Sequence, residues 1–187
     1  YDGAGASVDY KSIMAAFADP VIMLFLGGFV LAIAASKVGL DVILAKALLK
    51  PFGKNPKMIL LGFLLIIGVF SMFMSNTATA AMFLTFLAPV IASLPQGEKG
   101  KIGLALAIPI AANLGGMGTP IGTPPNAIAL GALQNAGVDI TFVDWMIRMV
   151  PYVLVMLFLA WILLSVMFPF ETKAIELKIE GTSNAPK

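Results

Sequence analysis

The sequence predicts an all-α polytopic membrane protein with a membrane domain over residues 19–170, and two observations predict it. Of the 187 residues, 59% are hydrophobic and only 12% are charged, whereas a soluble domain carries about 25% charged residues. The charges stand between long neutral runs that have the length of membrane segments. A chain with so little polar surface cannot cover itself in water, so its solvent is lipid. A net charge of +2 without a basic cluster also excludes nucleic acid as a partner.

The N-terminal part is predicted as a polar segment, 1–18, followed by a first span over 19–35. Asp19 and Pro20 make a good helix start, because proline fits the first helical turn. In the next stretch, 36–50, charged side chains recur at helical spacing among apolar ones. This pattern is typical of an amphipathic helix at the membrane surface, although an extension of the first span fits it equally well.

Two neutral runs occupy the centre of the chain, and each is too long for a single helix. Residues 58–97 and 102–138 contain no charge, while one spanning helix needs about 20 residues. The first run is predicted as two apolar arms over 58–94 that turn at the polar segment 75–79, either as two full spans or as a re-entrant hairpin. The second is predicted as a broken helix over 102–138, because the glycines and prolines in 113–126 cannot continue a regular helix.

The last apolar segment, 149–168, is long enough for one span, and a polar tail follows at 171–187. The loops at 46–57 and 95–101 carry more lysine than acid, which predicts the cytoplasmic side for both, and the acidic loop at 139–144 is predicted on the other side. With the loops on these sides, each apolar segment either crosses the membrane or returns to the side on which it began. The charges therefore predict a multi-pass topology.

The two polar breaks carry the residues that can bind a ligand. The first contains Ser71 and, one helical turn later, the Ser-Asn-Thr triplet at 75–77; the second runs over 118–126. A half-helix that ends at a break offers free carbonyls to a cation, and one that starts there offers free N–H groups to an anion. Two broken segments together can therefore hold a small cation beside an anion. For Ser71 and for the glycine pair at 115–116, close helix packing is the alternative explanation.

The uncharged character of these breaks narrows the choice of cation and argues against an enzyme. Hydroxyl, amide and carbonyl oxygens without carboxylates suit Na⁺, whereas a divalent cation needs charged ligands and proton coupling needs an ionisable residue inside the membrane. A partner segment outside the two runs can still supply a carboxylate. The chain has no His and no Cys, so it lacks the usual machinery of a protease or a metal site, and we expect no enzymatic activity.

The motifs in the two breaks resemble those of the divalent anion/sodium symporter family, which carries dicarboxylates, citrate or sulfate. The resemblance rests on Ser-Asn-Thr at 75–77, on Gly-Thr-Pro-Pro-Asn at 122–126 and on the glycine-rich approach at 115–119, and it covers nearly all of 19–170. It implies a fold of two inverted repeats, each with a re-entrant hairpin and a broken helix, in a transporter that moves like an elevator. Each motif occurs once here, so the chain looks like one repeat, and its glycine pattern looks like the N-terminal one.

The resemblance also implies a shared site for Na⁺ and substrate. The implied Na⁺ ligands are Ser71, Ser75, Asn76 and the backbone near Gly122. The implied substrate contacts are Asn76 and Thr77, with Thr123 and Pro124 close by. The implied partners are a divalent anion, the lipid bilayer, the second inverted repeat on the same or a separate chain, and a second copy in a homodimer.

The expected function is therefore Na⁺-coupled symport of a succinate-like dicarboxylate or a related divalent anion, citrate and sulfate included. The expected location is a bacterial inner (plasma) membrane, and this chain is expected to supply one half of the site. A non-transporting structural or regulatory membrane subunit, and an anion exchanger that is not coupled to Na⁺, are the alternatives.

Overall fold

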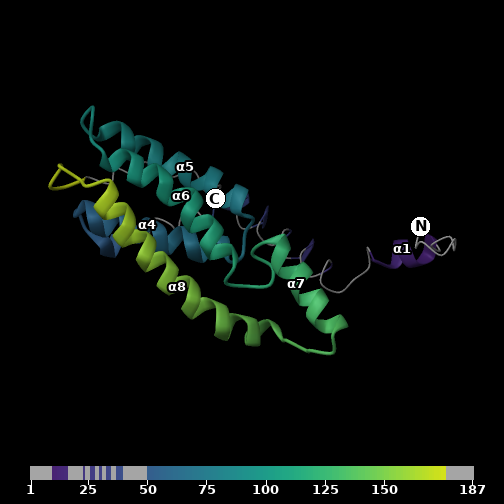
Figure 1. Ribbon diagram of the computed structural model, residues 1–187. Helices are drawn as coiled ribbons and strands as arrows, with labels where there is room; N and C mark the ends of the chain where they lie inside the picture. The colour runs from purple at the N-terminus through teal and green to yellow at the C-terminus, as the bar shows by residue number, and fades with distance from the viewer. Residues whose placement is uncertain are drawn as a thin grey trace, which may run out of the picture.

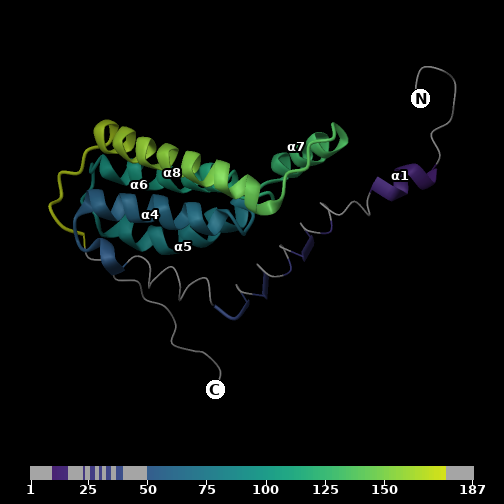
Figure 2. The ribbon, with the colours of Figure 1, turned by 90° about the horizontal axis from the view of Figure 1, so that it is seen from below.

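The computed structural model describes residues 10–16, 50–175 and isolated positions between 23 and 39. The expected span at 19–35 and the expected amphipathic helix at 36–50 lie outside the described residues, apart from isolated positions. Within the described residues the regular elements are all helices, which confirms the all-helical prediction for this part of the chain. The short helix α1 (Tyr10–Ala16) stands apart from the others (Figures 1 and 2).

Four helices lie side by side and form the body of the molecule. They are α4 (Pro56–Ser71), α5 (Asn76–Ser93), α6 (Gly100–Gly116) and α8 (Phe142–Met167). Helix α6 contacts α4, α5 and α8, while α4 also contacts α5 and α8, so α4 and α6 are the inner pair (Figure 2). Helix α7 (Pro124–Asn135) projects beyond the bundle, and the short 3-10 helix η1 (Lys50–Phe52) packs on α4 (Figure 1).

Local capping explains where two of these helices begin. The Asn55 side chain accepts a hydrogen bond from a backbone N–H in the first turn of α4 (3.0 Å). Before α8, the Thr141 and Asp144 side chains form a capping box with each other's backbone N–H groups. This box lets α8 begin at Phe142, ahead of the span expected from residue 149.

The core lies among α4, α5, α6 and α8, and the backbones of α4 and α6 approach closely within it. The rings of Phe63 on α4 and Phe83 on α5 are fully buried and meet edge to face, with their centroids 6.5 Å apart. On α6, a Cβ added at Gly115 would lie 2.2 Å from the carbonyl oxygen of Gly68 on α4. Only glycine permits this approach, so close packing accounts for Gly115.

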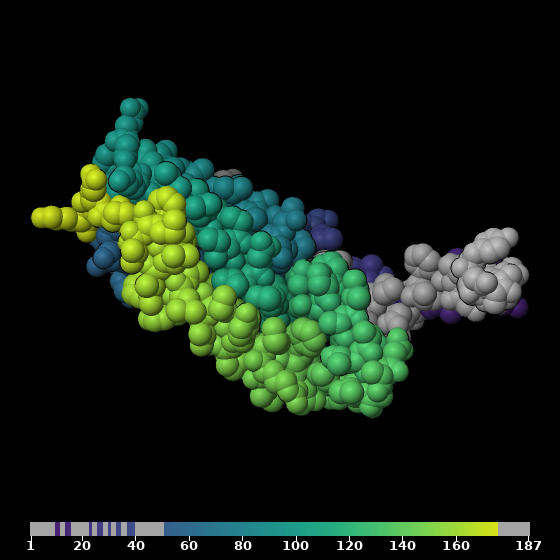
Figure 3. All heavy atoms as spheres, viewed as in Figure 1, coloured from purple at the N-terminus to yellow at the C-terminus, as the bar shows by residue number. Residues whose placement is uncertain are grey.

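The outer surface of the bundle is apolar, as a membrane segment requires. Helices α5 and α8 are long and apolar enough to cross a membrane, by length and composition, with 18 and 26 residues. Only 17% of the most apolar stretch of α8 is buried, and Figure 3 shows α8 along one face of the molecule. A helix in the core of a soluble protein would hide such side chains instead.

The segment after α8 closes the end of the bundle that lies away from the two breaks. Glu98, in the loop between α5 and α6, accepts hydrogen bonds from the Glu171 N–H (2.8 Å) and the Thr172 hydroxyl (2.7 Å). The Ile175 N–H donates to the Lys54 carbonyl (2.9 Å). The hydrogen bond from the Thr172 hydroxyl, followed by that from the Glu171 N–H, holds the pKa of Glu98 below its usual value. We call this arrangement the Glu98 clasp.

Candidate functional site

The two polar breaks meet at one end of the bundle. The turn 72–75 joins α4 to α5, and the unwound segment 117–123 joins α6 to α7. They touch where the Thr119 hydroxyl, which is fully buried, donates a hydrogen bond to the Met72 carbonyl. The fold therefore brings together two polar segments that are separated by more than a full helix in the sequence.

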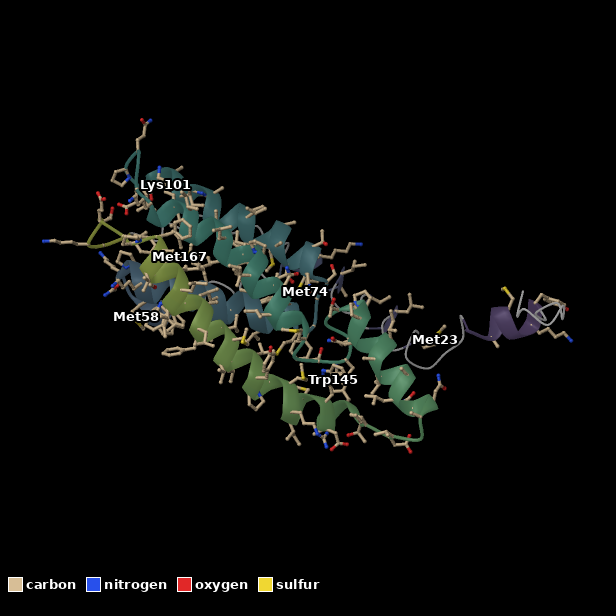
Figure 4. All side chains as sticks on the ribbon, viewed as in Figure 1. Met23, Met58, Met74, Lys101, Trp145 and Met167 are labelled. Atoms are coloured by element: carbon tan, nitrogen blue, oxygen red, sulfur yellow. The ribbon has the colours of Figure 1, made fainter. Side chains whose placement is uncertain are left out.

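Helix α8 braces the second break from the side. The indole Nε1–H of Trp145 donates a hydrogen bond to the Met117 carbonyl (3.0 Å), which is one of the carbonyls left free where α6 ends. Figure 4 places Trp145 and Met74 towards this end of the bundle and Lys101 at the other. The breaks therefore lie at the end of the bundle away from the Glu98 clasp.

Three oxygen atoms converge at the first break. Ser71 Oγ lies 2.8 Å from Asn76 Oδ1 and 2.7 Å from the carbonyl oxygen of Ala112 on α6. Ser71 is fully buried at the end of α4, and Asn76 is the first residue of α5. Because a serine hydroxyl carries a single hydrogen, it donates to one of these oxygens at a time. The arrangement is therefore rich in acceptors and poor in donors, which is the chemistry that a small cation needs.

Two glycines, at the end of α6 and in the unwound segment, allow close approach to these oxygens. A Cβ added at Gly116 would lie 2.5 Å from Asn76 Oδ1, and one added at Gly122 would lie 2.3 Å from the Gly116 carbonyl oxygen. The backbone at Gly122 thus lies next to Gly116, which in turn lies against Asn76. Of the implied Na⁺ ligands, Ser71 contacts Asn76, Asn76 lies against Gly116, and the backbone near Gly122 lies next to Gly116.

The other residues of the implied site lie at the starts of α5 and α7. Ser75 caps α5 and accepts a hydrogen bond from the Ala78 N–H (3.2 Å). Thr77 is exposed in the first turn of α5. Thr123 holds the capping position of α7 without a capping hydrogen bond from its side chain, and Pro124 is exposed in the first turn. Within the described residues, no hydrogen bond joins these two residues to α5.

Asn126 is a structural residue of the second break to which the sequence assigned no role. Its side chain is buried, and Nδ2 donates two hydrogen bonds of 2.8 Å, one to the Gly116 carbonyl and one to the Thr119 carbonyl. Both hydrogens of the amide are therefore used to tie the end of α6 to the start of α7. The sequence does indicate such a role through the amide of Asn126, because a polar side chain in a neutral run needs a hydrogen-bond partner.

Asn113 is a second residue that sequence reasoning left without a role. It lies in the last turns of α6, and its Oδ1 accepts a hydrogen bond from Asn76 Nδ2 (3.1 Å). One turn beyond Asn76 on α5, Thr79 is fully buried, and its hydroxyl has no hydrogen-bond partner in the described part of the chain. The site thus extends along α5 and α6 beyond the predicted residues.

The site is electrically neutral. Its side chains are hydroxyls and amides, and the described residues contain no group of three or more His, Cys, Asp or Glu residues that could hold a metal ion. Such a set of ligands is unsuited to a divalent metal, which prefers carboxylates, but it suits a monovalent cation.

Comparison with known proteins places the chain in a family. A family model described as "Citrate transporter" (CitMHS) matches residues 4–181. The chain is 39% identical over 169 residues to the sodium-dependent dicarboxylate transporter SdcS of Staphylococcus saprophyticus, a match that covers 84% of this chain and 33% of that protein. It is 36% identical over 165 residues to SdcS of Staphylococcus aureus, covering 82% of this chain and 32% of the relative. It is also 36% identical over 164 residues to the sodium-dependent high-affinity dicarboxylate transporter 3 of Caenorhabditis elegans, a match that covers 78% of this chain and 29% of that protein.

The chain spans about a third of the length of these curated relatives. The family match includes both breaks and all four helices of the bundle. The relatives are transporters and not enzymes, in agreement with the expectation that the chain is not an enzyme. The chain therefore belongs to the citrate transporter family, which confirms the resemblance to the divalent anion/sodium symporters, and the transporters that it matches imply a multi-pass integral membrane protein.

Proposed function

We propose that this chain supplies one half of a Na⁺-coupled symporter of dicarboxylates. The observation that carries the proposal is the meeting of two uncharged breaks at which Ser71 Oγ, Asn76 Oδ1 and the Ala112 carbonyl oxygen lie within hydrogen-bond distance. The relatives are named sodium-dependent dicarboxylate transporters, which supports the same ion and the same class of substrate.

Na⁺ is held by Ser71, Ser75, Asn76 and the backbone near Gly122. The Ser71 hydroxyl has a second acceptor, the Ala112 carbonyl at 2.7 Å, so it can turn its hydrogen there when the ion binds. The lone pairs of Ser71 Oγ and of Asn76 Oδ1 then both face the ion, and no donor is left unpaired. A cation thus replaces the one hydrogen atom that lies between these two oxygens.

The substrate carboxylate is held beside the ion, by Asn76 and Thr77 and by Thr123 and Pro124. Helices α5 and α7 both begin at a break, where the positive end of each helix dipole lies. The first N–H groups of α5 have no partner within the helix, whereas α7 begins with Pro124 and Pro125, which carry no N–H. A carboxylate placed at these helix starts is attracted by them and by the adjacent Na⁺. Each ion lowers the cost of burying the other, which is the physical basis for coupling.

The whole transporter is larger than this chain. Helices α4 and α5 form a re-entrant hairpin tipped by the turn 72–75, and a second inverted repeat, on the same or a separate chain, completes the site. The protein works as a homodimer in a bacterial inner membrane and carries its substrate by an elevator movement of the domain that holds the site. The exposed apolar side chains of α8 support a surface that lipid or further helices cover.

The test uses the full-length transporter in proteoliposomes. Dicarboxylate uptake is measured with an inward Na⁺ gradient and, separately, with a pH gradient in the absence of Na⁺. We expect uptake only with the Na⁺ gradient, and we expect Asn76→Ala to abolish it without loss of folded protein. Asn135→Ala is the control, because Asn135 is exposed at the far end of α7. Uptake driven by the pH gradient alone, or normal uptake by Asn76→Ala, would overturn the proposal.

A further inference from the structure

Asn113 accepts a hydrogen bond from the amide nitrogen of Asn76. Asn76 Nδ2 donates to Asn113 Oδ1 (3.1 Å), while Asn76 Oδ1 lies 2.8 Å from Ser71 Oγ. The two ends of the same amide therefore have different partners, the oxygen meeting the Ser71 hydroxyl on α4 and the nitrogen meeting Asn113 on α6. No other acceptor for Asn76 Nδ2 occurs among the hydrogen bonds of residues 50–175.

Asn113 lies at an apolar groove. Asn113 is the one polar residue among those that line an apolar groove of about 760 Å³ between α6 and α8. The neighbours of Asn113 on the groove wall are aliphatic, including Ile110 and Leu114 on α6 and Leu159 on α8. The bond between the two asparagines is exposed in this structure. Where lipid or further helices cover it, as in the proposed transporter, a hydrogen bond in apolar surroundings is electrostatically stronger than one in water, and an amide without a partner is costlier.

We propose that Asn113 is a positioning residue for the cation site: it accepts the Asn76 N–H and so holds Asn76 Oδ1 towards the ion. The inference rests on the proposed function, because it assumes that Asn76 binds Na⁺. When a cation draws electron density from Oδ1, the N–H groups of the same amide become stronger donors. The Asn113 oxygen is placed to accept that stronger donor, so it stabilises the ion-bound state more than the empty one.

A substitution at Asn113 can change ion binding without changing the stability of the fold. Asn113 is exposed in the described structure, so its replacement by Leu, which has a similar size and no acceptor, leaves the core intact. Without the acceptor, the amide of Asn76 is free to rotate, and in the reversed orientation it presents N–H groups to the cation. Asn113→Asp keeps an acceptor oxygen in the same place and is the conservative variant.

The experiment measures the Na⁺ concentration for half-maximal dicarboxylate uptake by the full-length transporter in proteoliposomes, together with the thermal unfolding of the purified protein in Na⁺ and in choline. We expect Asn113→Leu to raise the half-maximal Na⁺ concentration about tenfold, with an unchanged KM for dicarboxylate at saturating Na⁺. The increase in Tm caused by Na⁺ should be smaller than in the wild type, while the Tm in choline should equal that of the wild type. Asn113→Asp should retain the wild-type Na⁺ requirement or tighten it, and Asn135→Leu, the same change at an exposed asparagine of α7, should alter neither quantity.

Each other outcome overturns the inference. A wild-type Na⁺ requirement in Asn113→Leu shows that Asn113 does not act on the site, and a loss of Tm in choline equal to the loss in Na⁺ shows a purely structural role. A rise in the Na⁺ requirement of Asn113→Asp equal to that of Asn113→Leu shows that the acceptor is not what matters. If the wild-type transporter itself does not respond to Na⁺, the proposed function fails, and this result is distinct from the other three.

Discussion

The same substitution is expected to have different effects at two adjacent glycines near the end of α6. A Cβ at Gly115 would lie 2.2 Å from the backbone carbonyl oxygen of Gly68, and a Cβ at Gly116 would lie 2.5 Å from the side-chain oxygen of Asn76. The first obstacle is part of a buried helix and cannot move by itself. The second is the end of a side chain that can. We therefore expect Gly115→Ala to damage the fold and Gly116→Ala to damage the ion site.

The distances set the expected size of each effect. In Gly115→Ala the two inner helices must separate, and overpacking of this kind lowers the free energy of unfolding by about 1–3 kcal/mol or more. In Gly116→Ala the Asn76 oxygen must retreat by about 0.5 Å to reach 3.0 Å, the shortest approach that side chains tolerate. A binding site loses function when its ligands are misplaced by about that much. We expect a rise of about tenfold or more in the Na⁺ requirement.

The assay pairs thermal unfolding of the purified full-length transporter with Na⁺-dependent uptake in proteoliposomes. Gly115→Ala should lower the Tm in choline, and Gly116→Ala should keep that Tm but lose the increase caused by Na⁺. Gly131→Ala is the matched control, because no atom lies within 4 Å of a Cβ built there in α7. Equal losses of Tm in the two variants, or a normal Na⁺ requirement in Gly116→Ala, would refute the reasoning.

Three further predictions concern stability, and thermal unfolding of the full-length transporter checks each. Asn126→Leu removes both 2.8 Å hydrogen bonds across the second break and should lower the free energy of unfolding by about 2–3 kcal/mol, because two carbonyls lose their partner; an unchanged Tm would show that the break does not depend on this amide. Thr79→Val replaces a buried hydroxyl that has no partner and should change stability by less than about 0.5 kcal/mol or raise it; a large loss would reveal a hidden partner. Hydrogen bonds from Thr172 and the neighbouring backbone hold the pKa of Glu98 below its ordinary value of 4.5. The ionised form of Glu98 therefore stabilises the fold above pH 4.5, and this stabilisation is lost as the pH falls through the lowered pKa. Glu98→Gln should therefore flatten the fall in Tm on acidification, whereas Glu171→Gln, at an exposed side chain, should not.

The sequence predicts those parts of the fold that depend on local signals. The neutral runs predict α4, α5 and α6, and the apolar segment 149–168 predicts most of α8, because apolar length decides where a chain can enter lipid. The triplet at 75–77 predicts the turn between α4 and α5, since Ser75 caps α5 through its own hydroxyl. The glycines and prolines of 117–123 predict the break between α6 and α7, because they cannot continue a helix.

Contacts between distant residues escape such reasoning. Asn113 and Asn76 are 37 residues apart in the sequence, and Glu98 and Glu171 are 73 apart, so no pattern along the chain marks either pair. Each pairing depends on how the helices pack. The start of α8 is a different case, because its signal is local. Thr141 and Asp144 are three residues apart and have the spacing of a capping box, but Asp144 was counted only as a loop charge, and its bond with the Thr141 N–H (3.1 Å) shows it to be part of the cap.

The central claim is that the meeting of the two breaks forms a Na⁺ site made of uncharged oxygens. The most direct measurement is a high-resolution structure of the full-length transporter determined once in Na⁺ and once in choline. The account predicts that a compact density appears only in Na⁺, between Ser71 Oγ and Asn76 Oδ1 and beside the backbone at Gly122, at the short distances typical of a bound cation. Identical maps in the two salts, with the Ser71–Asn76 hydrogen bond intact in both, would contradict it.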